Sequence, residues 1–344
     1  MSQPKIAVLG AGANGASIGA DLAAAGVDVV LIEQWPEHVE AMRKNGIRIE
    51  MPNRTLTQDV RVFHLCDVAT FRDRFDVVLM LMKAYDSRWA AHLIEPYLKP
   101  DGLLVGVQNG MTAETIAEVV GPNRTLGCVI EVSSMMWEPG VVERNSPPER
   151  SWFAVGSLHP STRGREEEVA SLLRHSGTVE IMDEILAAKW MKLVSNAATL
   201  VTTAILGLPM LEAAHIPAMR RLMIRSSDEA LQVGEAVGYP VLPIFGVTRD
   251  EMPDDSYDLA EFLLDTLLEG FVLPETKTTV LQDWMKGRRS EVHDINGNVV
   301  RLGAGHGVAT PVNRAVVDVA RRIEAGELRP DPDNLDILLA AVEG

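Results

Sequence analysis

The chain has 344 residues, of which 47% are hydrophobic and 23% are charged, and this composition is typical of a globular protein rather than a disordered one. At roughly 150 residues per domain, we expect two domains. The formal net charge of -16 argues against nucleic acid or an anionic membrane surface as a partner, because either needs clustered Lys and Arg.

The cysteines and the N-terminus suggest the compartment. Cys66 and Cys128 are too few for a disulfide framework, and the N-terminus lacks the charged and apolar regions of a signal peptide. No run approaches the about 18 apolar residues of a membrane span. We therefore expect a cytoplasmic protein. The eight histidines show no closely spaced pair with acidic support, so we expect no metal site.

In the first part of the chain, short aliphatic runs alternate with stretches of helical periodicity. Such a stretch runs from Ala13 to Ala25, where Ile18 and Leu22 fall on one face. The runs that predict buried strands are Lys5–Gly10, Val27–Glu33, Asp76–Lys83, Gly102–Gly110 and Thr125–Ser134. This alternation is typical of a parallel, doubly wound sheet of the Rossmann type. Between Val141 and Leu158 a Pro-rich turn joins two strands, which we expect to finish that sheet in antiparallel orientation.

After Asp183 the pattern is almost wholly helical. The predicted helices are Glu184–Leu206, Ala218–Val237, Asp258–Phe271, Thr276–Met285, Val312–Ala325 and Asn334–Val342. The fold class is therefore predicted as α/β, with a dinucleotide-binding Rossmann domain over residues 1–183. We expect an all-helical domain for substrate binding and dimerisation over residues 184–344.

The stretch "GAGANG" has glycines at the three places of a dinucleotide-binding fingerprint. It follows a predicted strand and opens a predicted helix, which is the context that the fingerprint requires. Gly10 allows a tight turn, Gly12 lets a pyrophosphate approach the backbone, and Gly15 allows close packing of helix and strand. The alternative is a turn that merely needs glycines. The predicted cofactor-binding residues of this loop are Gly10, Ala11, Gly12, Ala13, Asn14 and Gly15.

The second predicted strand ends at Glu33, at the place where an acidic side chain usually accepts hydrogen bonds from the adenosine ribose. A carboxylate there repels a 2′-phosphate, so we expect NAD to be preferred over NADP. A solvated glutamate is the alternative, and NADP stays possible through Arg43 or Lys44.

Polar residues also end two other predicted strands. Ligands of open α/β sheets bind beyond the carboxyl ends of the strands, where Lys83 and Asn109 are expected. Carbonyl reduction with a nicotinamide needs a proton donor and groups that hold the ketone. In the helical part, Lys192 and Asn196 stand at positions i and i+4, so both side chains lie on one helix face.

Four motifs occur in an order that resembles the ketopantoate reductase (2-dehydropantoate 2-reductase) family. They are "GAGANG", "LMKAY" (Leu81–Tyr85), "QNGM" (Gln108–Met111), and the pair "KWMKLVSN" (Lys189–Asn196) and "SEVHDING" (Ser290–Gly297). "EPGVV" (Glu138–Val142) is also similar to a connection of that family. Each motif alone is weak, whereas the ordered set spans roughly residues 5–325.

The resemblance implies a role for each matching residue. Lys192 matches the helix lysine that protonates the substrate carbonyl oxygen, Asn196 matches a substrate-binding asparagine, and Glu291 matches a late catalytic glutamate. Lys83 and Asn109 match residues that contact the cofactor and help to position the acid. Thr279, beside Thr278, falls roughly where the family binds the substrate carboxylate with serine. Ser134 ends a predicted strand and is a further candidate cofactor contact.

Ordinary structural roles are the alternative for each of these residues. Lys192 is on its own more typical of a surface lysine that covers apolar residues with its stem. Glu291 is typical of a helix ion pair, and Asn109 before Gly110 of a turn. It is their joint occurrence in family order that favours catalytic and binding roles.

Two departures from the family pattern lie in the helical part of the chain. Leu200 stands where the family has a second asparagine, which indicates a less polar or differently shaped substrate than 2-dehydropantoate. The stretch 240–275 is longer and more acidic than the family core needs, and it is a lid, a dimerisation element or, by default, a surface addition.

These observations predict an NAD(P)-dependent oxidoreductase that interconverts a 2-oxo acid and its 2-hydroxy acid, with Lys192 as general acid and base. The alternatives are an NAD-linked dehydrogenase of another hydroxy acid or alcohol, and a regulatory protein that senses the dinucleotide without turnover. We expect a homodimer with a small-molecule substrate.

Overall fold

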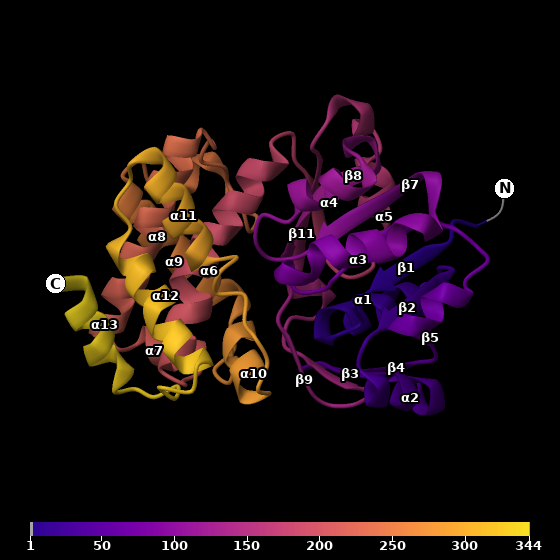
Figure 1. The fold of residues 1–344 in the computed structure, drawn as a ribbon, viewed down its shortest axis with the longest axis horizontal. Helices are drawn as coiled ribbons and strands as arrows, with labels where there is room; N and C mark the ends of the chain where they lie inside the picture. The colour runs from indigo at the N-terminus through magenta and orange to yellow at the C-terminus, as the bar shows by residue number, and fades with distance from the viewer. Residues whose placement is uncertain (1–2, 344) are drawn as a thin grey trace. The chain divides into compact units, whose positions relative to one another are not determined.

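The computed structural model describes residues 3–343. The chain forms two compact units, which divide between Leu186 and Ala187. The first unit combines a sheet with helices and the second is all helical (Figure 1). The predicted fold class, a parallel α/β sheet followed by an all-helical part, is confirmed.

In the described part of the first unit, eight strands form the main sheet in the order β12-β11-β8-β7-β6-β1-β2-β5. The strands from β8 to β5 are parallel, whereas β11 runs antiparallel to β8. The bounds are β1 Ile6–Leu9, β2 Val29–Glu33, β5 Arg61–His64, β6 Phe75–Met80, β7 Leu98–Val107, β8 Thr125–Glu131, β11 Trp152–Ser157 and β12 Thr178–Ile181. Strand order reverses at β1, because the chain runs outward through β2 and β5 and then returns to β6 on the other side.

Apolar side chains cover both faces of this sheet. In β1, Ile6 and Val8 join one buried cluster with α1, α2 and α5, while Ala7 and Leu9 join a second cluster with α3 and α4. Successive strand residues point to opposite faces, and both faces are covered, so the inner strands are mostly apolar runs rather than alternating ones. The helices are α1 Ala13–Ala24, α2 Pro36–Asn45, α3 Ser87–Ile94, α4 Ala113–Val120 and α5 Glu166–Leu173.

A second sheet of four strands, in the order β4-β3-β10-β9, was not predicted. Its strands are β3 Ile47–Glu50, β4 Thr55–Gln58, β9 Ser134–Glu138 and β10 Val141–Arg144. The prediction that both strands between Val141 and Leu158 finish the main sheet is therefore wrong for β10 and right for β11. The predicted strand Thr125–Ser134 is also wrong at its end. The backbone carbonyl of Ser133 accepts from Asn145 N at 2.8 Å, so the chain leaves β8 there and starts a hairpin.

The helical unit is built around two long helices, α6 and α8. The Trp190 Nε1 group of α6 donates to Ala230 O of α8 at 2.9 Å. A Cβ on Gly234 would lie 2.2 Å from Trp190 Nε1, so the glycine allows this close crossing. The helices are α6 Ile185–Ile205, α7 Met210–Ala214, α8 Pro217–Val237, α9 Ser256–Phe271, α10 Thr279–Met285, α11 Asn296–His306, α12 Pro311–Glu324 and α13 Asn334–Glu343. Of these, α7 and α11 were not among the predicted helices.

The stretch 240–275 contributes to the core of the helical unit. Helix α9 packs against α8 and buries one apolar face. Arg220 of α8 also pairs with Glu261 and Asp265 of α9 at 2.9 and 2.8 Å. The default expectation of a surface addition is therefore wrong, because an addition on the surface would leave the leucines of α9 in water. The buried ones are Leu259, Leu263, Leu264, Leu267 and Leu268.

A buried carboxylate closes the N-terminus of α12. Glu229 of α8 accepts from Val312 N at 2.8 Å, from Asn313 N at 3.0 Å and from Asn313 Nδ2 at 2.8 Å. Burial raises the pKa of Glu229 in spite of these hydrogen bonds. The carboxylate therefore replaces the side-chain cap that Thr310, the residue before the helix, does not provide.

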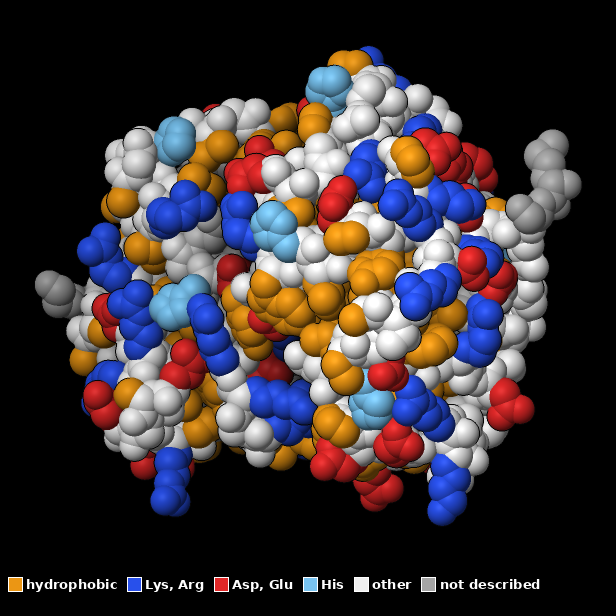
Figure 2. All heavy atoms as spheres, turned by 45° about the vertical axis from the view of Figure 1, so that its right-hand side comes forward, with side chains coloured by type: hydrophobic (Ala, Val, Ile, Leu, Met, Phe, Trp, Pro, Cys, Tyr) orange, Lys and Arg blue, Asp and Glu red, His pale blue; other side chains and the backbone are white. Residues whose placement is uncertain are grey.

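Lys and Arg side chains are interspersed with Asp and Glu over the face of the molecule that Figure 2 shows. Among the helices of residues 3–343, none combines the length and the apolar character that a membrane span requires. The same residues contain no group of three or more His, Cys, Asp or Glu side chains placed to hold a metal ion.

Candidate active site

The loop between β1 and α1 needs glycine at two of its three fingerprint positions. Gly10 has a φ of +92°, and a Cβ there would lie 2.9 Å from the backbone carbon of Leu81. A Cβ on Gly15 would lie 2.0 Å from the carbonyl oxygen of Gly10. The loop therefore packs tightly against its own helix and against the residues that follow β6.

Gly12 has a different role from the other two glycines. A Cβ built on it meets nothing within 4 Å, so packing within the protein does not require glycine there. Gly12 precedes α1, whose first N–H groups have no partner within the helix and carry partial positive charge. A Cβ at this place would occupy the space in which a pyrophosphate approaches these N–H groups. The loop thus fits a dinucleotide, as the sequence predicts.

A buried histidine holds this loop in place. His38 of α2 is fully buried, and its Nε2 lies 3.0 Å from the carbonyl oxygen of Ala11. Its Nδ1 accepts from Gly140 N at 2.8 Å, so Nδ1 carries no proton and Nε2 donates to Ala11. The neutral ring thus joins the glycine loop to the turn between β9 and β10. Sequence analysis missed this role, because a lone histidine in a helix carries no signal for its partners.

Burial lowers the pKa of His38 from 6.5 to about 4, and this predicts a pH-dependent stability. Below pH 6.5 the unfolded chain binds a proton at this histidine, whereas the folded chain binds it only near pH 4. The free energy of unfolding should therefore fall by about 3 kcal/mol as the pH falls through this window. Urea unfolding at a series of pH values measures this loss.

The matched variant for that prediction is His38→Gln. Glutamine can also donate to Ala11 O and accept from Gly140 N, but it does not titrate. Its free energy of unfolding should lack this part of the pH dependence. Profiles of the two proteins that stay parallel from pH 7 to pH 4 would contradict the assignment.

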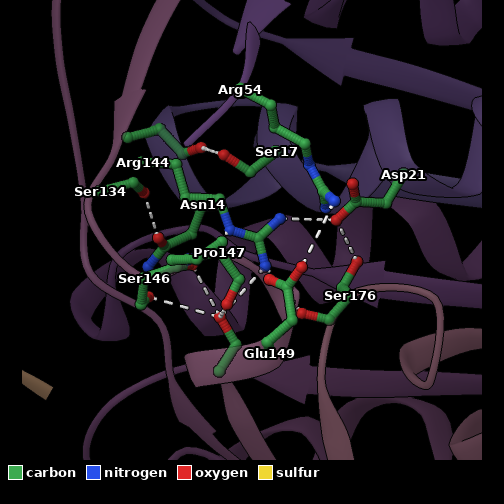
Figure 3. Close-up of polar contacts among 12 residues, drawn as sticks. Asn14, Ser17, Asp21, Arg54, Ser134, Arg144, Ser146, Pro147, Glu149 and Ser176 are labelled. Carbon is green, nitrogen blue, oxygen red and sulfur yellow. Dashed lines mark hydrogen bonds and ion pairs between the residues drawn. The ribbon is translucent and has the colours of Figure 1, made fainter. Parts of the chain in front are cut away.

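Two side chains predicted to bind the cofactor contact each other. The Ser134 hydroxyl, at the start of β9, donates to Asn14 Oδ1 in the first turn of α1 (Figure 3). Ser134 is buried, and this hydrogen bond links the second sheet to the dinucleotide helix. Its direct contact with a cofactor stays a prediction.

An ion pair further along the same helix is almost fully buried. Arg144 of β10 donates to Asp21 Oδ2 of α1 at 2.6 Å, and the two side chains are 0% and 8% exposed. Figure 3 shows the guanidinium among oxygens from several segments. It also donates to the carbonyl oxygens of Ser146 and Ser176, both at 2.7 Å. Ser176 Oγ donates to Asp21 Oδ2 at 2.8 Å, so both charges are well satisfied. The pair fixes α1 against β10.

Glu33 lies at the end of β2, as predicted, and is 7% exposed. Its Oε1 accepts from the backbone N–H groups of Gln34 and Trp35, both at 2.9 Å. The alternative, a solvated glutamate at the end of a strand, is therefore wrong. The carboxylate is held in a fixed orientation by the backbone that leads into α2.

Lys83 and Asn109 follow β6 and β7, which are neighbours in the sheet, and Gly10 follows β1 beside them. Gln108 ties the first two segments together. Its Nε2 donates to Met82 O at 2.6 Å and to Ser87 Oγ at 3.1 Å. Gly10, Lys83 and Asn109 are thus brought to one edge of the main sheet. Sequence analysis missed the role of Gln108, although this residue lies within the "QNGM" motif.

In the helical unit, Lys192 and Asn196 lie one turn apart on α6 and are 7% and 1% exposed. Burial contradicts the alternative of a surface lysine. The Lys192 Nζ lies 5.2 Å from the centroid of the Phe245 ring, on the face of the ring. Leu200, one further turn along the same helix face, is 9% exposed.

The two threonines at the start of α10 have different surroundings. Thr278 Oγ1 donates to Leu200 O at 2.9 Å and accepts from Leu281 N, so this residue caps α10. Thr279 Oγ1 is buried, and no hydrogen-bond partner is found for it among residues 3–343. Thr279 is therefore the threonine whose hydroxyl suits a bound ligand, and its role as a substrate contact stays a prediction.

Glu291 is 4% exposed and lies in a turn before α11, not in a helix. The alternative of an ordinary helix ion pair is therefore wrong in its geometry. The amide of Asn296 at the start of α11 donates to Ala197 O at 3.0 Å, which anchors this segment next to Asn196 on α6. Asp294 has a raised pKa because it is buried and, secondly, because it faces the charge of Glu291.

Comparison with known proteins identifies the family. Residues 6–157 match the ketopantoate reductase PanE/ApbA family, and residues 184–324 match its C-terminal domain, ketopantoate reductase PanE/ApbA C terminal. The chain belongs to the ketopantoate reductase family. It is therefore an NAD(P)-dependent oxidoreductase that acts on CH–OH groups.

Relatives of this ketopantoate reductase family member match it over nearly their whole length. The 2-dehydropantoate 2-reductase of Archaeoglobus fulgidus is 26% identical over 95% of this chain and 100% of the relative. That of Pyrococcus horikoshii is 28% identical over 90% of this chain and 94% of the relative.

Two solved structures share the fold. The ketopantoate reductase of Ralstonia eutropha has a TM-score of 0.78 and 27% identity, and the match covers 94% of this chain and 99% of that one. A D-mandelate dehydrogenase with NADH and anilino(oxo)acetate has a TM-score of 0.82 and 21% identity, with the same coverage.

Proposed function

We propose that this enzyme reduces the 2-oxo group of a 2-oxo acid to a 2-hydroxy group, with Lys192 as the general acid. The observation that carries the proposal is a lysine that is 7% exposed, one helical turn from an asparagine that is 1% exposed. Buried lysines are uncommon unless they are paired or functional. The substrate class is 2-dehydropantoate or a related, less polar 2-oxo acid.

The first unit holds the cofactor in this proposal. The N–H groups at the start of α1 bind the pyrophosphate, with the glycine loop fixed by His38. Lys83 and Asn109 contact the cofactor where β6 and β7 end. When bound, the nicotinamide supplies a hydride to the carbonyl carbon or accepts it in the reverse direction.

In this proposal the second unit donates the proton and binds the substrate. The Lys192 ammonium donates a hydrogen bond to the carbonyl oxygen and passes its proton to this oxygen as the carbon is reduced. In the reverse direction the neutral amine accepts the hydroxyl proton. Asn196, one turn away, and the Thr279 hydroxyl bind the substrate, and Glu291 supports the charged lysine. One hydride and one proton thus convert a 2-oxo acid to a 2-hydroxy acid.

A second candidate is an NAD-linked dehydrogenase that works mainly in the oxidative direction on another hydroxy acid or alcohol. Leu200, in place of a second amide, favours a less polar substrate than 2-dehydropantoate. The similarity in fold to a D-mandelate dehydrogenase solved with NADH is consistent with this candidate.

The loss of reduced-nicotinamide absorbance with a panel of 2-oxo acids tests the proposed reaction. The panel contains 2-dehydropantoate and acids of increasing apolar character. We expect oxidation of NADH or NADPH that depends on the acid and yields the 2-hydroxy acid. Binding of the dinucleotide without turnover of any 2-oxo acid or hydroxy acid would overturn the proposal.

Glu33 is proposed to favour NAD over NADP, and Glu33→Gln tests this. Glutamine keeps an oxygen that accepts from the N–H groups of Gln34 and Trp35 but removes the charge that repels a 2′-phosphate. The ratio of kcat/KM for NADH to that for NADPH should fall about tenfold. Glu37→Gln, which removes an exposed carboxylate four residues later, is the control for net charge and should leave the ratio unchanged. An unchanged ratio in Glu33→Gln would remove Glu33 from cofactor selection.

A further inference from the structure

Phe245 has a backbone conformation that its residue type disfavours. Its φ is +63°, and among residues 3–343 it is the one non-glycine residue with positive φ. Gly246 follows with a φ of +78°, and Val247 N donates to Ile244 O at 3.3 Å. Two successive residues with positive φ are typical of a type I′ turn, in which Asn-Gly is favoured. A phenylalanine there is strained, because its Cβ crowds a backbone carbonyl oxygen.

The contacts of the ring offset this cost. Phe245 is 8% exposed, and its ring centroid lies 5.4 Å from that of Phe271 at the end of α9. The ring also faces Lys192 Nζ at 5.2 Å. An asparagine would form the same turn without strain but would have no aromatic face for the lysine. A strained residue next to a group that carries the chemistry is a recurring feature of functional sites.

The position of the ring relative to Lys192 limits what a substrate can carry. If Lys192 donates a hydrogen bond of about 3 Å to a carbonyl oxygen, the groups on the carbonyl carbon fall roughly 4–5 Å from Nζ. The centroid of the Phe245 ring lies 5.2 Å from the same Nζ, so a substituent that is turned toward the ring would contact it. A polar substituent there would lose its hydration without gaining a hydrogen bond from the ring, whereas an apolar one would gain contact area. Leu200 adds a second apolar side chain, on the face of α6 that carries Lys192 and Asn196.

We propose that Phe245 is a specificity-determining residue that selects 2-oxo acids with a bulky apolar substituent on the carbonyl carbon. This inference rests on the proposed function, because it requires Lys192 to bind the carbonyl. The ring stabilises the lysine ammonium through its π face and forms an apolar wall for the substituent. The strained turn holds the ring in this position.

Two 2-oxo acids and two variants test the proposal. Phenylglyoxylate and pyruvate share the carbonyl and the carboxylate but carry a phenyl and a methyl group, respectively. The wild-type enzyme should have a kcat/KM for phenylglyoxylate at least about tenfold that for pyruvate. In Phe245→Asn, which suits the turn but lacks the ring, this ratio should fall about tenfold, mainly through KM for phenylglyoxylate. In Phe245→Tyr, which keeps the ring, the ratio should be retained.

The outcomes separate this inference from the proposed function. Turnover of 2-oxo acids with an equal loss for both substrates in Phe245→Asn overturns the role of Phe245 and leaves the proposed reaction standing. A wild-type preference for pyruvate would also overturn the role of Phe245 and leave the proposed reaction standing. Failure of the wild type to reduce any 2-oxo acid overturns the proposed reaction and this inference with it. A fall in the ratio for Phe245→Asn alone supports the role of Phe245.

Discussion

Lys192→Ala is expected to lower kcat for 2-oxo acid reduction by about 10²- to 10⁴-fold. The ammonium both holds the carbonyl oxygen and supplies its proton, and the variant has no group at this place that can do either. The dissociation constant for the dinucleotide should change by less than about twofold, because the residues that fit it belong to the first unit. Steady-state kinetics and a fluorescence titration with NADH measure the two quantities.

Lys192→Arg is the matched control for charge. Arginine keeps a cation near Phe245 but stays protonated at all accessible pH values, so it can bind the carbonyl oxygen without donating a proton. We expect kcat to stay low in this variant, while KM for the 2-oxo acid rises less than in Lys192→Ala. Thermal unfolding curves show whether each variant is folded. An arginine variant with more than about a tenth of wild-type kcat would show that positive charge, not proton donation, is the contribution of Lys192.

Arg144→Met is expected to lower the free energy of unfolding by about 3–5 kcal/mol. The substitution leaves the Asp21 carboxylate buried, with the Ser176 hydroxyl as its remaining partner from this cluster. Asp21 belongs to the helix whose N-terminus carries the glycine loop, so KM for the dinucleotide should also rise. Urea unfolding measures the first effect, and kinetics at saturating 2-oxo acid measure the second.

A double-mutant cycle with Asp21→Leu separates the pair from the rest of the fold. The double variant Asp21→Leu with Arg144→Met removes both charges, so it should lose clearly less stability than the sum of the two single losses. Losses that simply add, or an Arg144→Met variant within about 1 kcal/mol of wild type, would contradict the role given to this pair.

The parts of the fold that local pattern dictates were predictable. The glycine loop follows from its spacing between a predicted strand and a predicted helix, and Gly10 and Gly15 indeed leave no room for a Cβ. The inner strands of the main sheet follow from their apolar runs, since both faces of the sheet are covered there. The edge strands β5 and β12 are short and partly exposed, and they were not predicted. Lys192 and Asn196 share a helix face by their separation of four residues, and ordered resemblance to the family supplied their roles.

The parts that depend on distant contacts were not predictable. Strand β10 pairs with β3, which is almost a hundred residues earlier, and nothing in Val141–Arg144 distinguishes this from an extension of the main sheet. His38 shows its function only through Ala11 and Gly140, which the sequence does not place beside it. The ring of Phe245 reaches Lys192 through a turn that is disfavoured for phenylalanine, so propensity pointed away from it.

Chemical rescue of Lys192→Ala tests proton donation by the lysine most directly. The reduction rate of the variant is measured with ethylamine added at fixed pH and ionic strength, and with tetramethylammonium as a cation that has no proton to give. The account predicts that the rate rises in proportion to the ethylamine concentration, by about tenfold or more, and does not respond to tetramethylammonium. An equal response to both cations, or none to ethylamine, would contradict a proton-donating role for Lys192.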